Sequence, residues 1–376
     1  MAHAPPPLDP AALARSRALL DRLRRAAASD GFLPFDRYME IVLYAHEIGY
    51  YDRPHSPLGS GGDFYTAAHV DPLFAETLAL RLRAYRRAAA TSGPWSIVEL
   101  GPGDGTLAAG IARTFVGDPR GPEYVLIDRS SARAREAEDR VRAAAPGVVV
   151  RRAESVSALG PFVGAVVANE VLDAQPARRL RAAHGGWEEL GVRVTDEGVS
   201  EAVDGPARPV PGAPLPDPVD DGEVVEVSPL AEGIVREVAD HLVDGPAIFL
   251  DFGLEQSELL STHPHGTAAA VRDHRFLPDP YPVPGSSDLS VFVNFTRIRA
   301  AARAGGLAEV AYRSQAEALG AWGFEALRAE ALRAAPNAEA RVRRQLAMKN
   351  LLFGFERFRA LEVAPPSTAA RLASVT

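Results

Sequence analysis

From residue 94 onward the sequence alternates short apolar runs with longer stretches of helical pattern. The apolar runs have the length and composition of buried strands and cover residues 96–100, 124–127, 148–152, 164–168 and 247–250. Helical patterns follow several of them, as at 132–145, and a further helix is expected at 295–304. Strands that alternate with helices predict a mostly parallel sheet with helices on both faces, which is the α/β class.

The rest of the chain departs from this alternation. The N-terminal region has helical periodicity, with Asp71 expected to cap a helix that begins at Pro72. Alternating apolar residues and many prolines predict an inserted subdomain of antiparallel strands followed by a helix. Residues 256–288 are so rich in Pro, His and Gly that we expect an irregular loop insertion there. The predicted divisions are a helical N-terminal lid at 1–92, a first α/β half at 93–176, the β-rich and helical insertion at 177–244 and a second α/β half at 245–376.

A glycine-rich loop follows the first strand of the alternation. Gly101, Gly103 and Gly105 stand at alternate positions before a helix that is expected from Thr106. Such glycines permit positive φ and bring backbone amides close to a ligand at the N-terminus of the helix. The next strand ends at Asp128, 23 positions after Gly105, where nucleotide-binding α/β folds place a carboxylate on ribose hydroxyls. The spacing predicts a nucleotide-type cofactor.

Two cofactor classes compete for this loop. A dinucleotide site favours Gly-x-Gly-x-x-Gly, whereas the third glycine of this chain comes one residue early. Glu99 and Asp104 place negative charge where a pyrophosphate would lie. S-adenosyl-L-methionine has no phosphate, and its ammonium and sulfonium groups suit acidic surroundings. The loop therefore favours this methyl donor over NAD, and a tight turn with a purely structural role is the remaining alternative.

Polar residues also follow the later strands. Glu154 and Ser155 come after the third strand, where hydrogen-bonding groups for an adenine edge are needed. Asn169 and Glu170 come after the fourth strand and should face the transferred methyl group and its acceptor, because ligands bind beyond the carboxyl ends of parallel strands. Asp173 either joins them or caps a loop.

Composition narrows the chemistry. The chain has no cysteine and one lysine, Lys349, which excludes disulfides, thiolate metal ligands and cysteine nucleophiles. A net charge of −8 argues against nucleic acid as a partner. His263, His265 and His274 match no metal-ligand spacing, so no metal site is expected. The start of the chain does not resemble a secretory signal and no apolar window reaches the roughly 18 to 20 residues of a membrane helix, so we predict a cytoplasmic protein without a membrane partner.

Six segments, taken in order, resemble the MidA-like family of class I S-adenosylmethionine-dependent methyltransferases. They are Gly-Gly-Asp-Phe-Tyr-Thr (61–66), Glu-Leu-Gly-Pro-Gly-Asp-Gly-Thr-Leu (99–107), Asn-Glu-Val-Leu-Asp-Ala-Gln-Pro (169–176), Glu-Val-Ser-Pro (226–229), Leu-Asp-Phe-Gly (250–253) and Asp-Leu-Ser-Val-Phe-Val-Asn-Phe (288–295). Two segments depart from the family pattern: Asn294 stands in place of an aspartate, and Ala-His-Val at 68–70 in place of Pro-Glu-Ile.

The resemblance implies a Rossmann-like, seven-stranded, mostly parallel methyltransferase sheet with a helical N-terminal lid and an inserted antiparallel β subdomain. It implies S-adenosyl-L-methionine as cofactor, S-adenosyl-L-homocysteine as product and, as in the mitochondrial member of the family, a protein arginine as acceptor. The residues predicted to bind the cofactor are Gly62, Asp63, Thr66, Glu99, Gly101, Gly103, Asp104, Asp128, Arg129, Glu154, Ser155 and Asn169.

The acceptor decides which residues are catalytic. A guanidinium needs carboxylates that localise its charge on one nitrogen, and Glu170 and Asp173 are the candidates. A phenol, hydroxyl or carboxylate acceptor would recruit a histidine, for which His46 is the candidate unless it is a packed residue at a helix end. The alternatives to a protein arginine methyltransferase are therefore a small-molecule O- or N-methyltransferase and a non-catalytic assembly factor that binds the cofactor. The exposed insertions suggest a homodimer.

Overall fold

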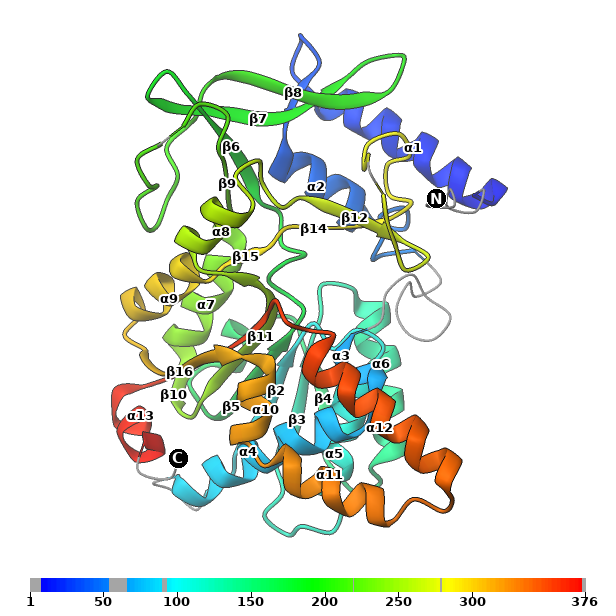
Figure 1. The fold of residues 1–376 in the computed structure, drawn as a ribbon, viewed down its shortest axis with the longest axis vertical. Helices are drawn as coiled ribbons and strands as arrows, with labels where there is room; N and C mark the ends of the chain where they lie inside the picture. Colours follow the sequence, from blue (N-terminus) through cyan, green and yellow to red (C-terminus); the bar gives the residue numbers. More distant parts are fainter. Residues whose placement is uncertain (1–7, 54–65, 90–92, 219, 278, 374–376) are drawn as a thin grey trace. The chain divides into compact units, whose positions relative to one another are not determined.

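The computed structural model describes residues 8–53, 66–89, 93–218, 220–277 and 279–373 (Figure 1). The chain divides into two compact units. The first comprises residues 1–64, 172–233 and 254–301, and the second comprises residues 65–171, 234–253 and 302–376. Each unit therefore contains segments that lie far apart in the sequence.

The second unit contains the alternation of strands and helices. Its elements are α3 (Ala67–Val70), α4 (Leu73–Ala88), β2 (Ser96–Leu100), α5 (Thr106–Arg113), β3 (Glu123–Ile127), α6 (Ser131–Ala144), β4 (Val150–Ala153), a 3-10 turn (Ser157–Leu159), β5 (Phe162–Asn169), β10 (Leu242–Asp244), β11 (Ala247–Leu254), β16 (Ala308–Ser314), α10 (Gln315–Ala321), α11 (Phe324–Arg333), α12 (Ala338–Phe353), β17 (Phe358–Ala364) and α13 (Pro366–Ala373).

These strands form one sheet with the order β16-β17-β11-β5-β2-β3-β4 along its main path, and β10 pairs with β5. The strands from β11 to β4 run parallel, whereas β17 is antiparallel to both β11 and β16. In the central ladder Leu100 of β2 pairs with Ile127 on one side and Ala168 on the other, so β2, β3 and β5 end at the same level. The predicted mostly parallel sheet is confirmed, with seven strands along its main path and further strands beside them.

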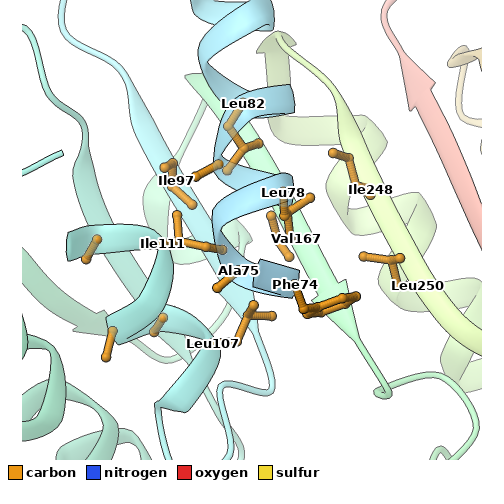
Figure 2. Packing of buried hydrophobic residues seen from close by; sticks show 14 of the residues in the cluster. Phe74, Ala75, Leu78, Leu82, Ile97, Leu107, Ile111, Val167, Ile248 and Leu250 are labelled. Atoms are coloured by element: carbon orange, nitrogen blue, oxygen red, sulfur yellow. The ribbon is translucent and has the colours of Figure 1, made fainter. Parts of the chain in front are cut away.

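Helix α4 buries its apolar face on this sheet. Phe74, Leu78 and Leu82 recur one turn apart and pack with Ile97 of β2 and Leu250 of β11 in a single buried cluster (Figure 2). A helix covers a sheet in this way when apolar residues recur every three to four positions. The start of α4 differs by one residue from the prediction: it begins after Pro72, and the Asp71 carboxylate accepts a hydrogen bond from the Leu73 amide (2.9 Å).

The first unit combines helices with two antiparallel sheets. Its elements are α1 (Pro10–Ala26), β1 (Phe32–Pro34), α2 (Phe35–Tyr44), β6 (Arg178–Ala183), β7 (Gly186–Val194), β8 (Val199–Pro206), β9 (Val224–Val227), α8 (Gln256–Thr262), β12 (Ala269–Arg272), β13 (Arg275–Leu277), β14 (Asp288–Ser290) and β15 (Val293–Asn294). Helices α7 (Pro229–His241) and α9 (Phe295–Ala304) begin in this unit and continue into the second. One sheet has the order β1-β7-β6-β9 with β8 beside β7, and the other has the order β13-β12-β14.

The structure of the two insertions agrees with the sequence prediction only in part. The antiparallel strands expected after residue 177 are present as β6, β7 and β8, and β1 from the N-terminal region joins their sheet. The irregular loop expected at 256–288 is wrong, because α8, β12 and β13 lie within it. These strands have only three or four residues, too few for an alternating pattern to stand out among the prolines and glycines.

Candidate functional site

The order of strands in the second unit points to one position for a ligand, at the carboxyl ends of the central strands. From β2 the chain passes to β3 and β4 on one side, then returns to β5 on the other side of β2. Open α/β sheets bind ligands at such a switch point, outside the carboxyl ends of the strands. The candidate site is therefore the set of residues that follow β2, β3, β4 and β5.

The loop after β2 depends on glycine for steric reasons. Gly101 and Gly105 have φ of 60° and 81°, in the left-handed region that side chains other than glycine rarely adopt. A Cβ at Gly101 would lie 2.8 Å from Val171 Cγ2, and one at Gly105 would lie 2.6 Å from Ala137 Cα. The loop thus packs directly on the turn after β5 and on helix α6, with no room for a side chain at either glycine.

The side chain of Asp104, in this loop, makes its contacts with other residues of the second unit. Its carboxylate accepts hydrogen bonds from the amide and hydroxyl of Thr106 (3.0 and 2.9 Å) and pairs with Arg140 (3.2 Å). His69 bridges two segments, because its Nε2 lies 3.3 Å from Asp104 Oδ2 and its Nδ1 lies 2.8 Å from Thr66 Oγ1. Burial would raise the pKa of Asp104, but the hydrogen bonds from His69 and Thr106 lower it to about 2. Asp104 is therefore ionised at neutral pH and ties Thr66 to the glycine loop.

Glu99 points into the core of the second unit. Its side chain is buried and accepts a hydrogen bond from the Tyr124 hydroxyl on β3. Burial raises the pKa of Glu99 to about 7, against the lowering effect of the Tyr124 hydrogen bond. Near neutral pH this carboxyl is therefore only partly ionised, unlike Asp104 five residues later.

The residues after β3 and β4 differ in burial. The Asp128 side chain is only 3% exposed, accepts a hydrogen bond from the Ser130 amide (2.8 Å) and pairs with Arg133 (3.2 Å). Arg129 is exposed. After β4, Glu154 is exposed, whereas the Ser155 hydroxyl accepts a hydrogen bond from the Ala158 amide (3.1 Å) and so caps the 3-10 turn.

The turn after β5 is strained. Glu170 has a φ of 56°, and a residue other than glycine in this left-handed region costs about 1–2 kcal/mol. Its Oε1 accepts hydrogen bonds from the Ala67 amide (3.2 Å) and from Asn169 Nδ2 (3.1 Å). Asn169 Oδ1 is buried and has no hydrogen-bond partner among the described residues. Strained backbone conformations cluster at functional sites, and a buried acceptor without a hydrogen bond calls for an explanation such as a ligand.

Backbone contacts with β11 hold this turn in place. The Glu170 amide donates to the Leu250 carbonyl (2.9 Å), and the Val171 amide donates to Asp251 Oδ2 (3.0 Å). Asp251 is 1% exposed, and its Oδ1 accepts a further hydrogen bond from the Phe252 amide (2.9 Å). Sequence reasoning gave Asp251 no role, since Val171 lies 80 positions earlier in the sequence, in the turn after β5.

Two predicted catalytic residues belong to the first unit. The His46 side chain is 84% exposed, and its Nδ1 lies 2.9 Å from Asp52 Oδ2. This exposure contradicts the alternative of a packed histidine at a helix end. The Asp173 carbonyl accepts a hydrogen bond from the Val291 amide (3.1 Å). Asp173 also lies near Tyr51, whose pKa is raised well above its ordinary value by burial and by the charges of Asp288 and Asp173.

Gly62 and Asp63, also predicted to bind the cofactor, lie outside the described residues. The same holds for the other residues from 54 to 65.

Several motif residues of the first unit have structural roles. The buried Glu226 carboxylate accepts hydrogen bonds from the Thr267 and Ala268 amides and from Arg179. Asn294 Oδ1 accepts from the Arg297 amide (3.3 Å) at the start of α9, and its Nδ2 donates to Gln256 Oε1 (3.2 Å). Asparagine and aspartate both cap helices, so the departure at 294 keeps the cap and adds a donor.

Within the described ranges, no three His, Asp or Glu side chains come together as a group that could hold a metal ion. No described helix combines the length and the apolar character that crossing a membrane requires.

Comparisons with known proteins agree on one family. A family model described as "Putative S-adenosyl-L-methionine-dependent methyltransferase" matches residues 76–312. The mitochondrial protein arginine methyltransferase NDUFAF7 homolog of Drosophila melanogaster is 27% identical over 332 residues, which span 78% of this chain and 73% of that protein. Human NDUFAF7, named as a mitochondrial protein arginine methyltransferase, is 26% identical over 311 residues, spanning 75% of this chain and 68% of that protein.

A solved structure resembles nearly the whole chain. It is a protein of Burkholderia thailandensis crystallised with S-adenosyl-homocysteine, 32% identical in sequence, with a TM-score of 0.83. The match covers 96% of this chain and 95% of that one.

Proposed function

The chain belongs to the family of S-adenosyl-L-methionine-dependent methyltransferases, and from this premise we propose that it methylates a guanidinium nitrogen of a protein arginine. The observation that carries the proposal is the Glu170 carboxylate, held in a strained turn at the carboxyl end of β5. The relatives named as protein arginine methyltransferases support the choice of acceptor.

The hydrogen-bond acceptors at the carboxyl ends of the strands suit this cofactor. Asn169 Oδ1 is a buried acceptor without a hydrogen-bond partner among the described residues, as an ammonium or amide donor of a ligand would require. Asp128, at the end of β3, offers a carboxylate to ribose hydroxyls. Gly101 packs on Val171 without room for a side chain, so the loop is held against the turn that carries Asn169 and Glu170. We assign the adenine edge to Glu154 and Ser155, which follow β4.

The reaction needs an aligned acceptor and an exit for a proton. When bound, the cofactor supplies an electrophilic methyl group on a sulfonium. The Glu170 carboxylate would localise the positive charge of the guanidinium on the nitrogen that it contacts, which leaves a lone pair on the other terminal nitrogen. That nitrogen would bond to the methyl carbon as the carbon–sulfur bond breaks, with the bonding pair left on sulfur, and Glu170 would then accept the proton that the methylated guanidinium loses. Asp173 stays a candidate for a second carboxylate.

The acceptor can be tested with a labelled methyl group. Purified protein is incubated with cell extract and cofactor that carries a labelled methyl, and the protein fraction is hydrolysed to amino acids. We expect the label in methylarginine. Label confined to small molecules would instead establish the small-molecule methyltransferase. Binding of the cofactor without any transfer would establish the non-catalytic assembly factor, and either result would overturn the proposal.

A further inference from the structure

Asp251 lies where the regular pairing of two strands ends. The parallel ladder between β5 and β11 runs from Val166 and Ala247 to Asn169 and Leu250. Beyond it the Glu170 amide still reaches the Leu250 carbonyl (2.9 Å), but the next amide, that of Val171, donates to the Asp251 side chain (3.0 Å). After the last backbone hydrogen bond to β11, the amide of the following residue is therefore held by a side-chain carboxylate.

This hydrogen bond lies next to the strained residue. Glu170 can keep its φ of 56° only if the peptides on both sides of it are fixed. The Leu250 carbonyl fixes the amide before its Cα, and Asp251 fixes the amide after it. Asp251 is 1% exposed and its other oxygen accepts from the Phe252 amide (2.9 Å), so the carboxylate has little freedom to move.

The same contact reaches the glycine loop. Val171, whose amide Asp251 holds, packs so closely on Gly101 that a Cβ there would lie 2.8 Å from Val171 Cγ2. The Gly101 amide in turn donates to the Ile127 carbonyl at the end of β3 (2.8 Å). A shift of Val171 would therefore displace both Glu170 and the first glycine of the cofactor loop.

We propose that Asp251 is a positioning residue that sets, through the Val171 amide, both the left-handed backbone of Glu170 and the packing of the glycine loop. The inference rests on the proposed function, since it concerns how that site is assembled. In this role Asp251 differs from buried carboxylates that only stabilise the fold. Asp251 itself touches neither cofactor nor acceptor in this role.

The test uses Asp251→Asn in the full chain, with Asp244→Asn as the matched control. Asp244 is also a buried carboxylate of the second unit, but it lies beside the start of β11 and accepts from Thr368 Oγ1 (2.5 Å) and Tyr85 (3.2 Å). Calorimetry measures the affinity for S-adenosyl-L-homocysteine, and circular dichroism measures the melting temperature. We expect D251N to weaken binding about tenfold, and D244N to leave binding unchanged while lowering the melting temperature.

A second background distinguishes positioning from general stability. Glycine adopts a positive φ without strain, so in a Glu170→Gly background the backbone needs the Asp251 contact less. There we expect D251N to weaken binding by less than about threefold. If D251N alone fails to fold, E170G must restore both the fold and binding.

Three results would overturn the inference: binding by D251N equal to wild type, the same loss in both backgrounds, or a double variant that stays unfolded. Wild-type protein that does not bind S-adenosyl-L-homocysteine would instead reject the proposed function, so the two failures are distinguishable.

Discussion

Two buried carboxylates near β11 are held in different ways. Asp244, the last residue of β10 and just before the start of β11, accepts hydrogen bonds from Tyr85 and Thr368 and pairs with Arg371, so side chains from α4 and α13 converge on it. Asp251 lies within β11, just after its pairing with β5 ends, and accepts hydrogen bonds from the backbone amides of Val171 and Phe252. One carboxylate ties helices to the sheet, and the other fixes the path of a turn.

This difference separates stability from function within one sheet. The start of β11 carries no strained residue, whereas the turn that Asp251 holds contains Glu170 in a left-handed conformation and borders an Asn169 oxygen without a donor among the described residues. Proteins retain such features where a ligand supplies the missing contact. Changes beside the start of β11 should therefore alter stability, and changes at Asp251 or in the turn that it holds should alter binding and turnover.

The largest effect on stability is expected for Arg81→Ala. Arg81 of α4 donates from Nε (2.9 Å) and Nη2 (2.7 Å) to Glu362, which pairs with Ile248 near the start of β11. The substitution leaves a buried carboxylate without its cation, so the free energy of unfolding should fall by about 3–5 kcal/mol in urea titrations. The affinity of the folded protein for the cofactor should not change. Arg328→Ala, which breaks an exposed pair with Glu325, is the control and should cost less than about 1 kcal/mol. A loss of cofactor affinity in R81A would contradict the claim that residues beside the start of β11 affect stability without affecting binding.

In the turn after β5 that Asp251 holds, Glu170→Gln should lower kcat about a hundredfold, because a positioned acid–base group contributes roughly 10²–10⁴ in rate. The melting temperature should change little, since the amide oxygen of glutamine can still accept from Ala67 and Asn169. Glu136→Gln, on an exposed position of α6, is the matched control and should keep full activity. Equal turnover by both variants would remove Glu170 from the mechanism.

Glu99→Gln should change the dependence of stability on pH. Burial raises the pKa of Glu99 from 4.5 to about 7, so the folded protein binds this proton more tightly than the unfolded chain does. The contribution to stability is complete below pH 4.5 and is lost as the pH rises through 7. Glutamine cannot ionise, so E99Q should be more stable than wild type at pH 8, by about 3 kcal/mol, and should not be more stable at pH 4. Parallel urea titrations at both pH values measure this, and identical pH profiles would show that Glu99 does not carry the effect.

The smallest effect is expected for His69→Ala. Loss of the contact to Asp104 should cost about 1 kcal/mol and raise the pKa of Asp104 from about 2 toward 3.8. The depressed pKa stabilises the fold above pH 3.8, and this stabilisation is lost as the pH falls through about 2, so H69A should lose less stability than wild type in acid. NMR titration of the Asp104 carboxyl carbon checks the shift. An unchanged pKa of Asp104 would show that Thr106 and Arg140 hold it low without His69.

Much of the second unit could be predicted from the sequence. The strand at 96–100 has the predicted bounds, and so has the helix at 295–304, which begins in the first unit, because an unbroken apolar run or a clear helical period is a local property of the chain. The family resemblance, the fold class and the cofactor are confirmed by the family match.

What the sequence missed depends on contacts between distant segments. The role of Asp251 requires the knowledge that β11 pairs with β5, and the role of His69 requires that α3 lies beside the glycine loop. The strands β12 and β13 are stabilised by pairing with each other and leave no periodic trace in a segment rich in Pro and Gly. The individual site assignments remain predictions that the variants above test.

The central claim, that the carboxyl ends of β2, β3 and β5 bind the cofactor, is tested most directly by calorimetric titration of S-adenosyl-L-methionine into wild-type protein and Asp128→Ala. Asp128 follows β3 directly, at the position where nucleotide-binding α/β folds place a carboxylate on the ribose hydroxyls. Binding by the wild type and a loss of at least about tenfold in D128A, with both proteins folded, is the predicted result. No binding by the wild type, or equal affinity in the two proteins, would contradict it.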